Sequence, residues 1–376
     1  DHELLAFAEG FLLSSYQFNK YKTGDEEGRG KITIKTLKVV SKTLSPIDLQ
    51  QIDVLVKANF IARDLVNEPL NNLNAVALSE RISEACKKRK VLVEVMNKTK
   101  IASLKMGGLL AVNKGSVDPP TFTIAEWKPD KYINKKPYVL VGKGIVYDTG
   151  GMSLKPANSM AGMKADMAGA ATMAATICAV AEAKLPLHVI ALIPATDNRT
   201  DGNAYVPDDI IKMYDGSTVE VVNTDAEGRL ILADALSYAK KYDPELVIDA
   251  ATLTGSAMRA IGDQGAVGMN NRAGIQMSKL IKTGEDVYER IVEFPMWDEY
   301  NKQLKSEVAD IKNIGGASAG AITAGKFLDH FTDYPFIHLD IAGVAFIDKK
   351  DSYRGIGATG FGVRLLFRFL QQMAKK

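Results

Sequence analysis

The chain has 376 residues, of which 46% are hydrophobic and 24% charged, as is ordinary for a soluble globular protein. This length exceeds one ordinary hydrophobic core, so two domains are the natural expectation. The 47 basic and 45 acidic residues leave a formal net charge of only +2. This near balance gives no global field for nucleic acid or a membrane surface, and no apolar stretch reaches the ~18 residues that a membrane span needs.

The two cysteines, Cys86 and Cys178, are too few for a disulfide framework. Neither has a CxxC partner or a neighbouring histidine, so we interpret both as buried small hydrophobic residues. Together with the lack of a recognisable signal peptide, they favour a reducing, cytoplasmic setting.

The first 66 residues contain few predicted elements. Residues 3–15 are apolar and predict a helix, and residues 32–40 alternate like a strand. Ser45 and Pro46 predict an N-cap and first turn of a helix that continues to about residue 66. One helix and one strand cannot form a core. We therefore interpret residues 1–44 as the C-terminal remnant of an N-terminal α/β domain, 45–66 as a linking helix and 67–376 as a second domain.

Helices and apolar strands alternate through this second domain. Helices are expected over residues 75–88, 169–182, 230–241 and 323–331, and strands over 91–95, 138–146, 187–193, 219–222, 246–249 and 336–341. Several strands are nearly continuous runs of Val, Ile and Leu, which is typical of a sheet covered by helices on both faces. The pattern predicts a three-layer α/β/α domain with a mostly parallel mixed sheet.

Functional groups in open α/β sheets gather beyond the carboxyl ends of the strands. Three predicted strands run directly into polar, glycine-containing segments, at residues 141–155, 223–230 and 249–255. A fourth polar segment, 163–169, precedes a helix of small residues. These segments contain the candidate functional residues.

Asp225 and Glu227 are two residues apart, so in extended backbone their carboxylates would point the same way. Two like charges on one face disfavour each other unless a cation lies between them. The alternative is that Asp225 caps a helix beginning near Glu227, since acidic residues suit a helix N-terminus.

Lys143 and Asp148 lie at the end of an apolar strand, where a charged lysine is costly to bury. They could form a buried ion pair. Alternatively, Lys143 could lose its proton and donate its amine to a metal, because a divalent cation can lower a lysine pKa from its usual value of about 10.4. Asp166 could either cap the helix that follows it or join the same site.

The histidines are poor candidates for metal ligands. We expect packing or surface roles for His2, His188, His330 and His338 from their positions along the chain. Any metal would then be held mainly by oxygen, which suits hard or borderline divalent ions.

Several of these segments resemble one family in its order and with its spacing. The octapeptide Asn223-Thr-Asp-Ala-Glu-Gly-Arg-Leu230 resembles the signature of the leucyl aminopeptidase (cytosol aminopeptidase) family, and Val141-Gly-Lys-Gly-Ile-Val-Tyr-Asp148 resembles its lysine–aspartate metal segment. The match continues through 163–167, 249–255, 313–327 and 338–343, so it covers roughly residues 60–376. The resemblance implies that 67–376 is a catalytic metallopeptidase domain.

The resemblance also implies roles for individual residues. Lys143, Asp148, Asp166 and Glu227 would hold a tightly bound metal, and Asp148, Asp225 and Glu227 a second, more exchangeable one. Zinc is the usual metal, with manganese, magnesium or cobalt accepted at the looser site. Lys155 and Arg229 match the catalytic positions that do not bind metal. The positions implied for the substrate pocket are Met163, Asn223, Thr252, Leu253 and Gly255.

The implied reaction is hydrolysis of the N-terminal residue, preferably leucine or another apolar residue, from a peptide. A metal-bridging hydroxide would attack the bond, Lys155 would stabilise the oxyanion, and Arg229 would hold a bicarbonate that shuttles the proton. The family forms homohexamers, as a dimer of trimers. Nucleic acid is not an expected partner of this chain.

Two other classes remain as alternatives. A two-metal phosphoesterase would be expected to use more histidine ligands and basic phosphate clamps. A non-enzymatic scaffold that kept the fold would have no need for Lys155 and Arg229, and both are present.

Overall fold

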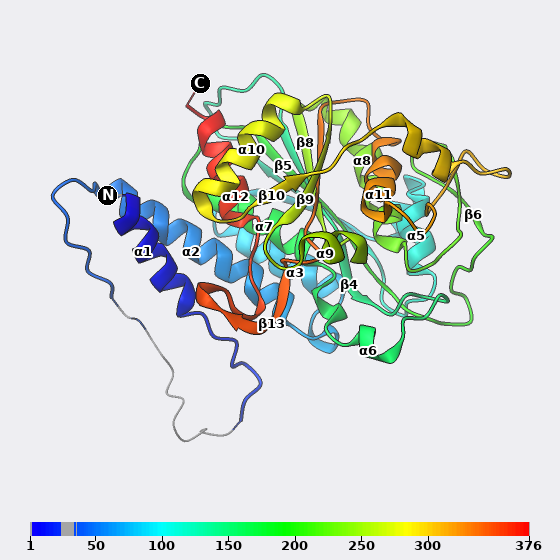
Figure 1. Cartoon of the computed structure of the whole chain (residues 1–376), viewed down its shortest axis with the longest axis horizontal. Helices are drawn as coiled ribbons and strands as arrows, with labels where there is room; N and C mark the ends of the chain where they lie inside the picture. The colour runs from blue at the N-terminus through cyan, green and yellow to red at the C-terminus, as the bar shows by residue number, and fades with distance from the viewer. Residues whose placement is uncertain (1, 24–33, 35, 376) are drawn as a thin grey trace.

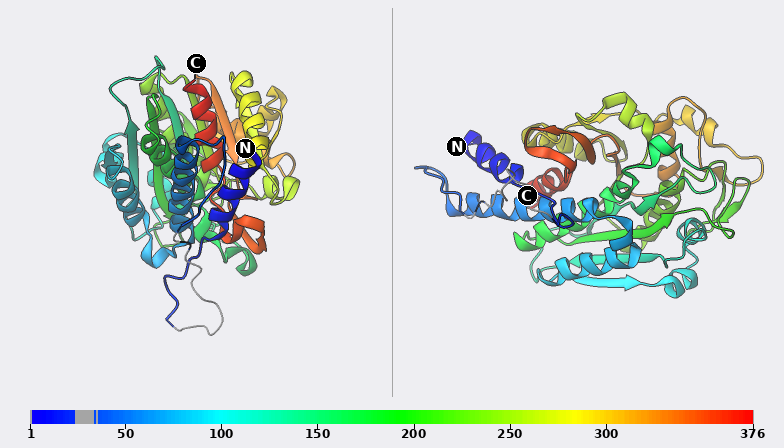
Figure 2. Two further views of the ribbon diagram at one scale, coloured as in Figure 1. Left: turned by 90° about the vertical axis from the view of Figure 1, so that its left-hand side faces the viewer. Right: turned by 90° about the horizontal axis from the view of Figure 1, so that it is seen from below.

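The computed structural model describes residues 2–23, 34 and 36–375. A large twisted sheet forms its centre, and helices lie on both faces of that sheet (Figures 1 and 2). The α-helices are α1 (His2–Ser14), α2 (Pro46–Asn67), α3 (Ala75–Lys87), α4 (Lys98–Ser103), α5 (Gly107–Asn113), α6 (Ala157–Met160), α7 (Ala168–Glu182), α8 (Glu227–Ala239), α9 (Gly255–Ile261), α10 (Gly274–Val287), α11 (Gly320–Asp329) and α12 (Val363–Met373).

The strands divide into one large sheet and two small ones. They are β1 (Leu92–Met96), β2 (Thr121–Trp127), β3 (Tyr138–Gly142), β4 (Gly144–Asp148), β5 (Val189–Asn198), β6 (Ile210–Lys212), β7 (Thr218–Glu220), β8 (Leu246–Ala251), β9 (Ala266–Asn271), β10 (Ile291–Glu293), β11 (Ile311–Lys312), β12 (Phe336–Asp340), β13 (Phe346–Asp351) and β14 (Gly355–Ala358). The large sheet has the order β1-β2-β5-β3-β8-β12-β9-β10, with β4 beside β5.

The centre of the large sheet is parallel. Strands β5, β3, β8 and β12 all run the same way, and β4 runs parallel to β5. The antiparallel pairs are β1 with β2, β2 with β5, and β12 with β9. The predicted mostly parallel mixed sheet is therefore confirmed. Its parallel strands bring their carboxyl ends to one edge, where a site is expected.

The helices form a layer on each face of this sheet. Helices α3, α7 and α12 share one apolar core with it, and α2 packs on the outside of α7. Helices α5, α8 and α11 share the other core. Helix α7 is buried from Ala168 to Ala181 and consists largely of small residues, so it can lie close to the sheet while α2 covers it. The predicted three-layer α/β/α arrangement is confirmed.

The N-terminal region matches the prediction in its helices only. Ser45 caps α2, and the side chain of Asp48 reaches back to the Ser45 backbone, which completes a capping box of about 1 kcal/mol. The strand predicted over 32–40 is wrong for residues 34 and 36–40, which have no regular structure; residues 32, 33 and 35 lie outside the described part of the chain. Leu37 and Val39 pack near α1 and α2 instead of pairing with a strand. The proposed domain boundaries remain predictions.

Candidate metal centre

Lys143 lies at a break between two strands. The sequence predicted one strand over 138–146, but β3 ends at Gly142 and β4 begins at Gly144. Strand β3 lies between β5 and β8, whereas β4 pairs with β5. The Lys143 backbone N–H donates to the Ala250 carbonyl of β8 at 3.2 Å, and its carbonyl accepts from Ala170 N at the start of α7 at 2.9 Å. These two hydrogen bonds fix the backbone of Lys143 between the end of β3 and the start of β4.

Three glycines allow other segments to approach this lysine closely. A Cβ added to Gly142 would lie 2.6 Å from the Gly169 carbonyl oxygen, and one added to Gly169 would lie 2.0 Å from the Ala250 carbonyl oxygen. A Cβ added to Gly228 would lie 2.4 Å from Lys143 Cε. A residue without a side chain is required at each of these contacts.

The inner group of the site consists of Lys143, Asp166 and Glu227. Lys143 Nζ lies 2.8 Å from Asp166 Oδ2 and 2.9 Å from Glu227 Oε1. The three side chains are only 3%, 8% and 1% exposed, in that order. Burial alone would lower the pKa of Lys143, but the carboxylates of Asp166 and Glu227 raise it above its usual range. Without a metal ion, Lys143 is therefore charged, and it forms ion pairs with Asp166 and Glu227 rather than mainly with Asp148.

The outer group consists of Lys155, Asp148 and Asp225. Lys155 Nζ lies 2.8 Å from Asp148 Oδ2 and 2.5 Å from Asp225 Oδ1. Burial of Lys155 opposes its charge, but both carboxylates raise its pKa, and Asp148 contributes more than Asp225. The Asp225 side chain is 35% exposed, which opens this group to solvent.

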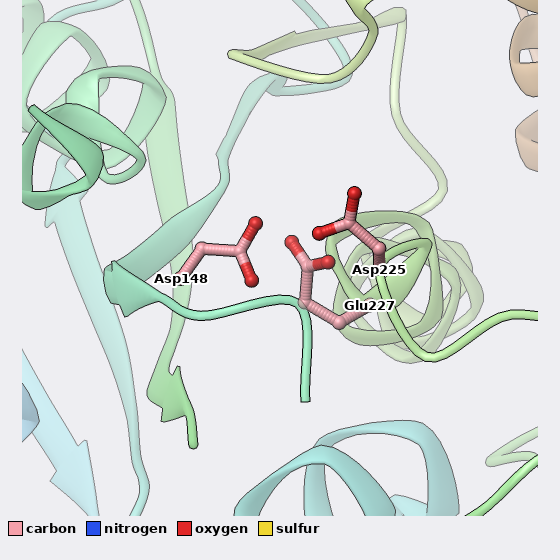
Figure 3. Close-up of side chains that lie close together, drawn as sticks. All are labelled: Asp148, Asp225 and Glu227. Atoms are coloured by element: carbon pink, nitrogen blue, oxygen red, sulfur yellow. The ribbon is translucent and has the colours of Figure 1, made fainter. Parts of the chain in front are cut away.

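The two groups meet at three carboxylates. Asp148 at the end of β4 and Asp225 and Glu227 at the start of α8 point toward a common space (Figure 3), and one oxygen from each lies within 4.8 Å of the others. Burial raises the pKa values of Asp225 and Glu227, as it does for Asp166, because crowded buried carboxylates resist ionisation. Bound divalent cations would relieve this cost.

The donor set fits such cations. Carboxylate oxygens predominate, and Asp166 Oδ2 is buried without a directed hydrogen bond although Lys143 Nζ lies close to it. Oxygen ligands suit hard or borderline divalent ions. Within the described residues, the cluster that could hold a metal contains no histidine.

The helix-capping alternatives are not realised. Helix α8 has Ala226 at its N-cap, and α7 has Met167, and neither forms a side-chain cap. The expectation that Asp225 and Glu227 lie in extended backbone is wrong: Asp225 is in a turn and Glu227 is the first residue of α8. Their carboxylates converge because the chain turns into the helix between them.

The comparisons with known proteins agree with this geometry. Residues 60–367 match the cytosol aminopeptidase family, catalytic domain. The chain belongs to the cytosol aminopeptidase family. It is therefore a metalloexopeptidase, which is a hydrolase of peptides. In the part of the chain that the structure describes, no helix is long and apolar enough to cross a membrane.

Individual relatives cover most of the chain. A probable cytosol aminopeptidase of Chloroherpeton thalassium is 46% identical over 379 aligned residues, which span 96% of this chain and 74% of the relative. One from Chlorobaculum parvum is 52% identical over 82% of this chain and 62% of the relative. The solved bottromycin maturation enzyme BotP in complex with Mn superposes with a TM-score of 0.91 at 32% identity, covering 99% of this chain and 79% of that one.

Arg229, the second family position that does not bind metal, lies in the first turn of α8. Its Nη1 donates to the Asn313 carbonyl at 2.8 Å, while its Nε is buried without a hydrogen-bond partner. Burial lowers the pKa of Arg229 to about 10, so the guanidinium is still charged at neutral pH. An unused donor on a planar cation suits a small planar anion.

Of the residues expected to line a substrate pocket, Thr252 contacts the inner group and Asn223 contacts Asp225 of the outer group. Thr252 follows β8, donates from Oγ1 to Asp166 Oδ1 at 2.8 Å, and accepts from Lys143 Nζ at its carbonyl. Asn223 precedes α8 and accepts from the Asp225 backbone N–H at 2.7 Å. Leu253 follows Thr252, Gly255 begins α9, and Met163 begins the short 3-10 helix that leads to Asp166.

Three further polar residues near the site were not given roles from the sequence. Asn198 ends β5, Asp340 ends β12 and accepts from Thr254 Oγ1 at 2.7 Å, and Asn313 accepts from the Val222 and Asn223 backbone. The strand-end rule that found Lys143 would also have found Asn198 if the strand predicted over 187–193 had been extended to 198.

The histidines have other partners. His338 is fully buried and its Nδ1 lies 2.8 Å from Asp249 Oδ2, whereas His188 Nε2 lies 2.7 Å from Glu126 Oε1. Both contacts are structural interactions between strands of the large sheet or their flanks.

Proposed function

We propose that this chain removes the N-terminal residue of peptides, with a preference for leucine or another apolar residue, at a centre of two divalent metal ions. Lys143, as the neutral amine left after loss of its proton, would hold the inner ion together with Asp148, Asp166 and Glu227. Asp148, Asp225 and Glu227 would hold the outer ion. The observation that carries this proposal is that each of two lysines, Lys143 and Lys155, lies at ion-pair distance from two carboxylates. Glu227 of the inner group and Asp148 of the outer group face each other where the two groups meet.

The metals are expected to be zinc, with manganese, magnesium or cobalt acceptable at the outer position. When bound, they would supply Lewis acidity and a water-derived nucleophile at neutral pH. Because Asp225 is partly exposed, its carboxylate places negative charge where the free amine of a peptide would approach.

Lys155 is the residue that we assign to the developing oxyanion. Its Nζ lies at the outer carboxylates and its side chain is 15% exposed, so it can reach a bound peptide without crossing the core. In the metal-free protein, the carboxylates of Asp148 and Asp225 raise its pKa and keep the ammonium charged. A fixed cation beside the scissile carbonyl stabilises negative charge as that charge develops.

Arg229 would hold a bicarbonate ion through its unpartnered Nε. Bicarbonate would supply a proton-accepting oxygen that no metal occupies, since the carboxylates of the described cluster are the expected ligands and the cluster contains no histidine to act as a base. The buried guanidinium orients such an anion because its own position is fixed by Asn313.

The preference for an apolar first residue rests on the pocket positions. Met163 and Leu253 supply apolar surface, while Gly255 takes up no side-chain space. A leucine side chain would gain from leaving water there.

A leucyl-anilide assay tests the proposal. Protein incubated with manganese or zinc should release leucine and the aniline, and a chelator should abolish release until metal is restored. N-acetyl-leucyl-anilide is the matched control, because its amine is blocked, and it should not be cleaved. Cleavage of phosphate esters with no release from leucyl-anilide would contradict the proposal and favour the phosphoesterase.

The homohexamer remains a prediction from the family resemblance, and the cytoplasmic location remains a prediction from the sequence. Sedimentation of the purified chain tests the first of them.

A further inference from the structure

Asn198 lies directly beside the proposed centre. It is the last residue of β5, it pairs in register with Asp148 of the parallel strand β4, and it is 1% exposed. Its backbone carbonyl accepts from Thr149 N at 2.9 Å, so the strand end itself is fixed.

The amide of Asn198 faces three acceptors. Its Nδ2 lies 2.8 Å from Asp148 Oδ1, 3.0 Å from the Thr224 carbonyl and 3.5 Å from Glu227 Oε2. All three atoms are hydrogen-bond acceptors, because two are carboxylate oxygens and one is a carbonyl oxygen. The NH2 group of the Asn198 amide must therefore point toward them. Asn198 therefore donates to one carboxylate strongly and lies against a second.

These contacts divide the oxygens of Asp148. Asn198 binds Oδ1, which leaves Oδ2 facing Lys155 Nζ at 2.8 Å. Because the amide is neutral, it orients the carboxylate without the positive charge that would compete with a divalent cation. A lysine at this position would repel that cation.

The amide also joins the segments that carry the ligands. Thr224, whose carbonyl Asn198 binds, donates from Oγ1 to the Gly150 carbonyl at 2.6 Å and accepts from Ser153 N at 2.7 Å. Thr224 thus connects the turn before α8 to the loop after β4, and Asn198 adds a second link through its bonds to the Thr224 carbonyl and Asp148 Oδ1. Loss of the amide would remove this second link.

We propose that Asn198 is a positioning residue that holds Asp148 and Glu227 in the geometry needed to share two metal ions. This inference rests on the proposed function. Partners that orient metal ligands typically contribute about 10- to 100-fold to metal affinity or activity. We expect a loss of that size when the amide donor is removed.

Two substitutions separate the hydrogen bonds from packing. Asn198→Ala removes the donor and leaves a cavity, while Asn198→Leu removes the donor and keeps a similar volume. Asn113→Ala is the matched control: Asn113 is also 1% exposed and also contacts β5, through Thr196 Oγ1 at 3.1 Å, but it donates to no carboxylate of the site. Manganese binding is measured by calorimetry, folding by thermal melting, and turnover as separate kcat and KM values.

The expected result is that both Asn198 variants bind manganese about 10- to 100-fold more weakly than wild type and have a lower kcat. Asn113→Ala should melt earlier yet bind manganese normally. Wild-type affinity in Asn198→Leu, or an equal loss in Asn113→Ala, would overturn the inference alone. If the wild-type protein binds no metal, the proposed function fails and the inference fails with it.

Discussion

The site contains the same arrangement twice, in two different environments. Lys143 and Lys155 each lie between two carboxylates at ion-pair distance. The inner lysine is 3% exposed and the outer one 15%, and the carboxylates differ more, since Asp166 is 8% exposed and Asp225 is 35%. The same kinds of residue are therefore buried in the inner group and partly exposed to solvent in the outer group.

This difference assigns the two lysines to different tasks. A sealed lysine can interact only with its own carboxylates and with a cation among them, whereas an open lysine can also reach a substrate. The inner half should hold its metal tightly and the outer half should exchange it. Four substitutions test this comparison.

Glu227→Ala should have the largest effect, because Glu227 contacts Lys143 and also faces Asp148 and Asp225. Both proposed metals would lose a ligand. We expect kcat/KM to fall more than about 1,000-fold, beyond the 10- to 100-fold typical of partners outside the ligand set. Leucyl-anilide kinetics measure the fall in kcat/KM, and atomic emission measures the metal content. Glu126→Ala is the control, because Glu126 contacts His188. Near-wild-type activity would refute the assignment.

Lys155→Met should lower kcat by about 10²- to 10³-fold, as removal of one oxyanion donor does, while both metals are retained.

Lys143→Met should instead lose metal from the inner group. It should also lower the free energy of unfolding of the metal-free protein, because two buried carboxylates lose their cation. Metal content and thermal melting of the two variants measure the contrast. Equal metal loss in both would remove the distinction between the halves.

Gly228→Ala should have the smallest effect of the four substitutions. The added Cβ would lie 2.4 Å from Lys143 Cε and 2.6 Å from its Nζ, so the ammonium must move. We expect about 10-fold weaker metal binding by calorimetry, within the range for indirect changes at a ligand. Gly274→Ala is the control, since Gly274, like Gly228, lies in the first turn of a helix, but an added Cβ there would meet nothing within 4 Å. Unchanged binding in Gly228→Ala would show that Lys143 can adjust freely.

The sequence predicted the parts of the fold that depend on local signals. Ser45 and Pro46 located the start of α2, and runs of branched apolar residues located most central strands. Polar residues after those strands led to Lys143 and Asp148, because the edge where parallel strands end is determined by chain direction.

Features that depend on contacts between distant segments were not predicted. At Lys143 the chain passes from β3, which pairs with both β5 and β8, to β4, which pairs with β5, and nothing in the local sequence indicates this change. Strands β2 and β9 and helices α10 and α12 were missed. The grouping of Lys143 with Asp166 and Glu227 came from family resemblance, since the residues alone suggested Asp148 as its partner.

Gly142, Gly169 and Gly228 enclose Lys143 from a strand and two helices. Even a methyl group at any of these positions would collide with a carbonyl oxygen or with the lysine itself. Lys143 and the three glycines thus form a four-residue unit that spans 87 sequence positions, from 142 to 228. Transplanting only the charged residues into another sheet would leave this unit incomplete. Any substitution at the three glycines would also displace the Lys143 amine or the backbone around it.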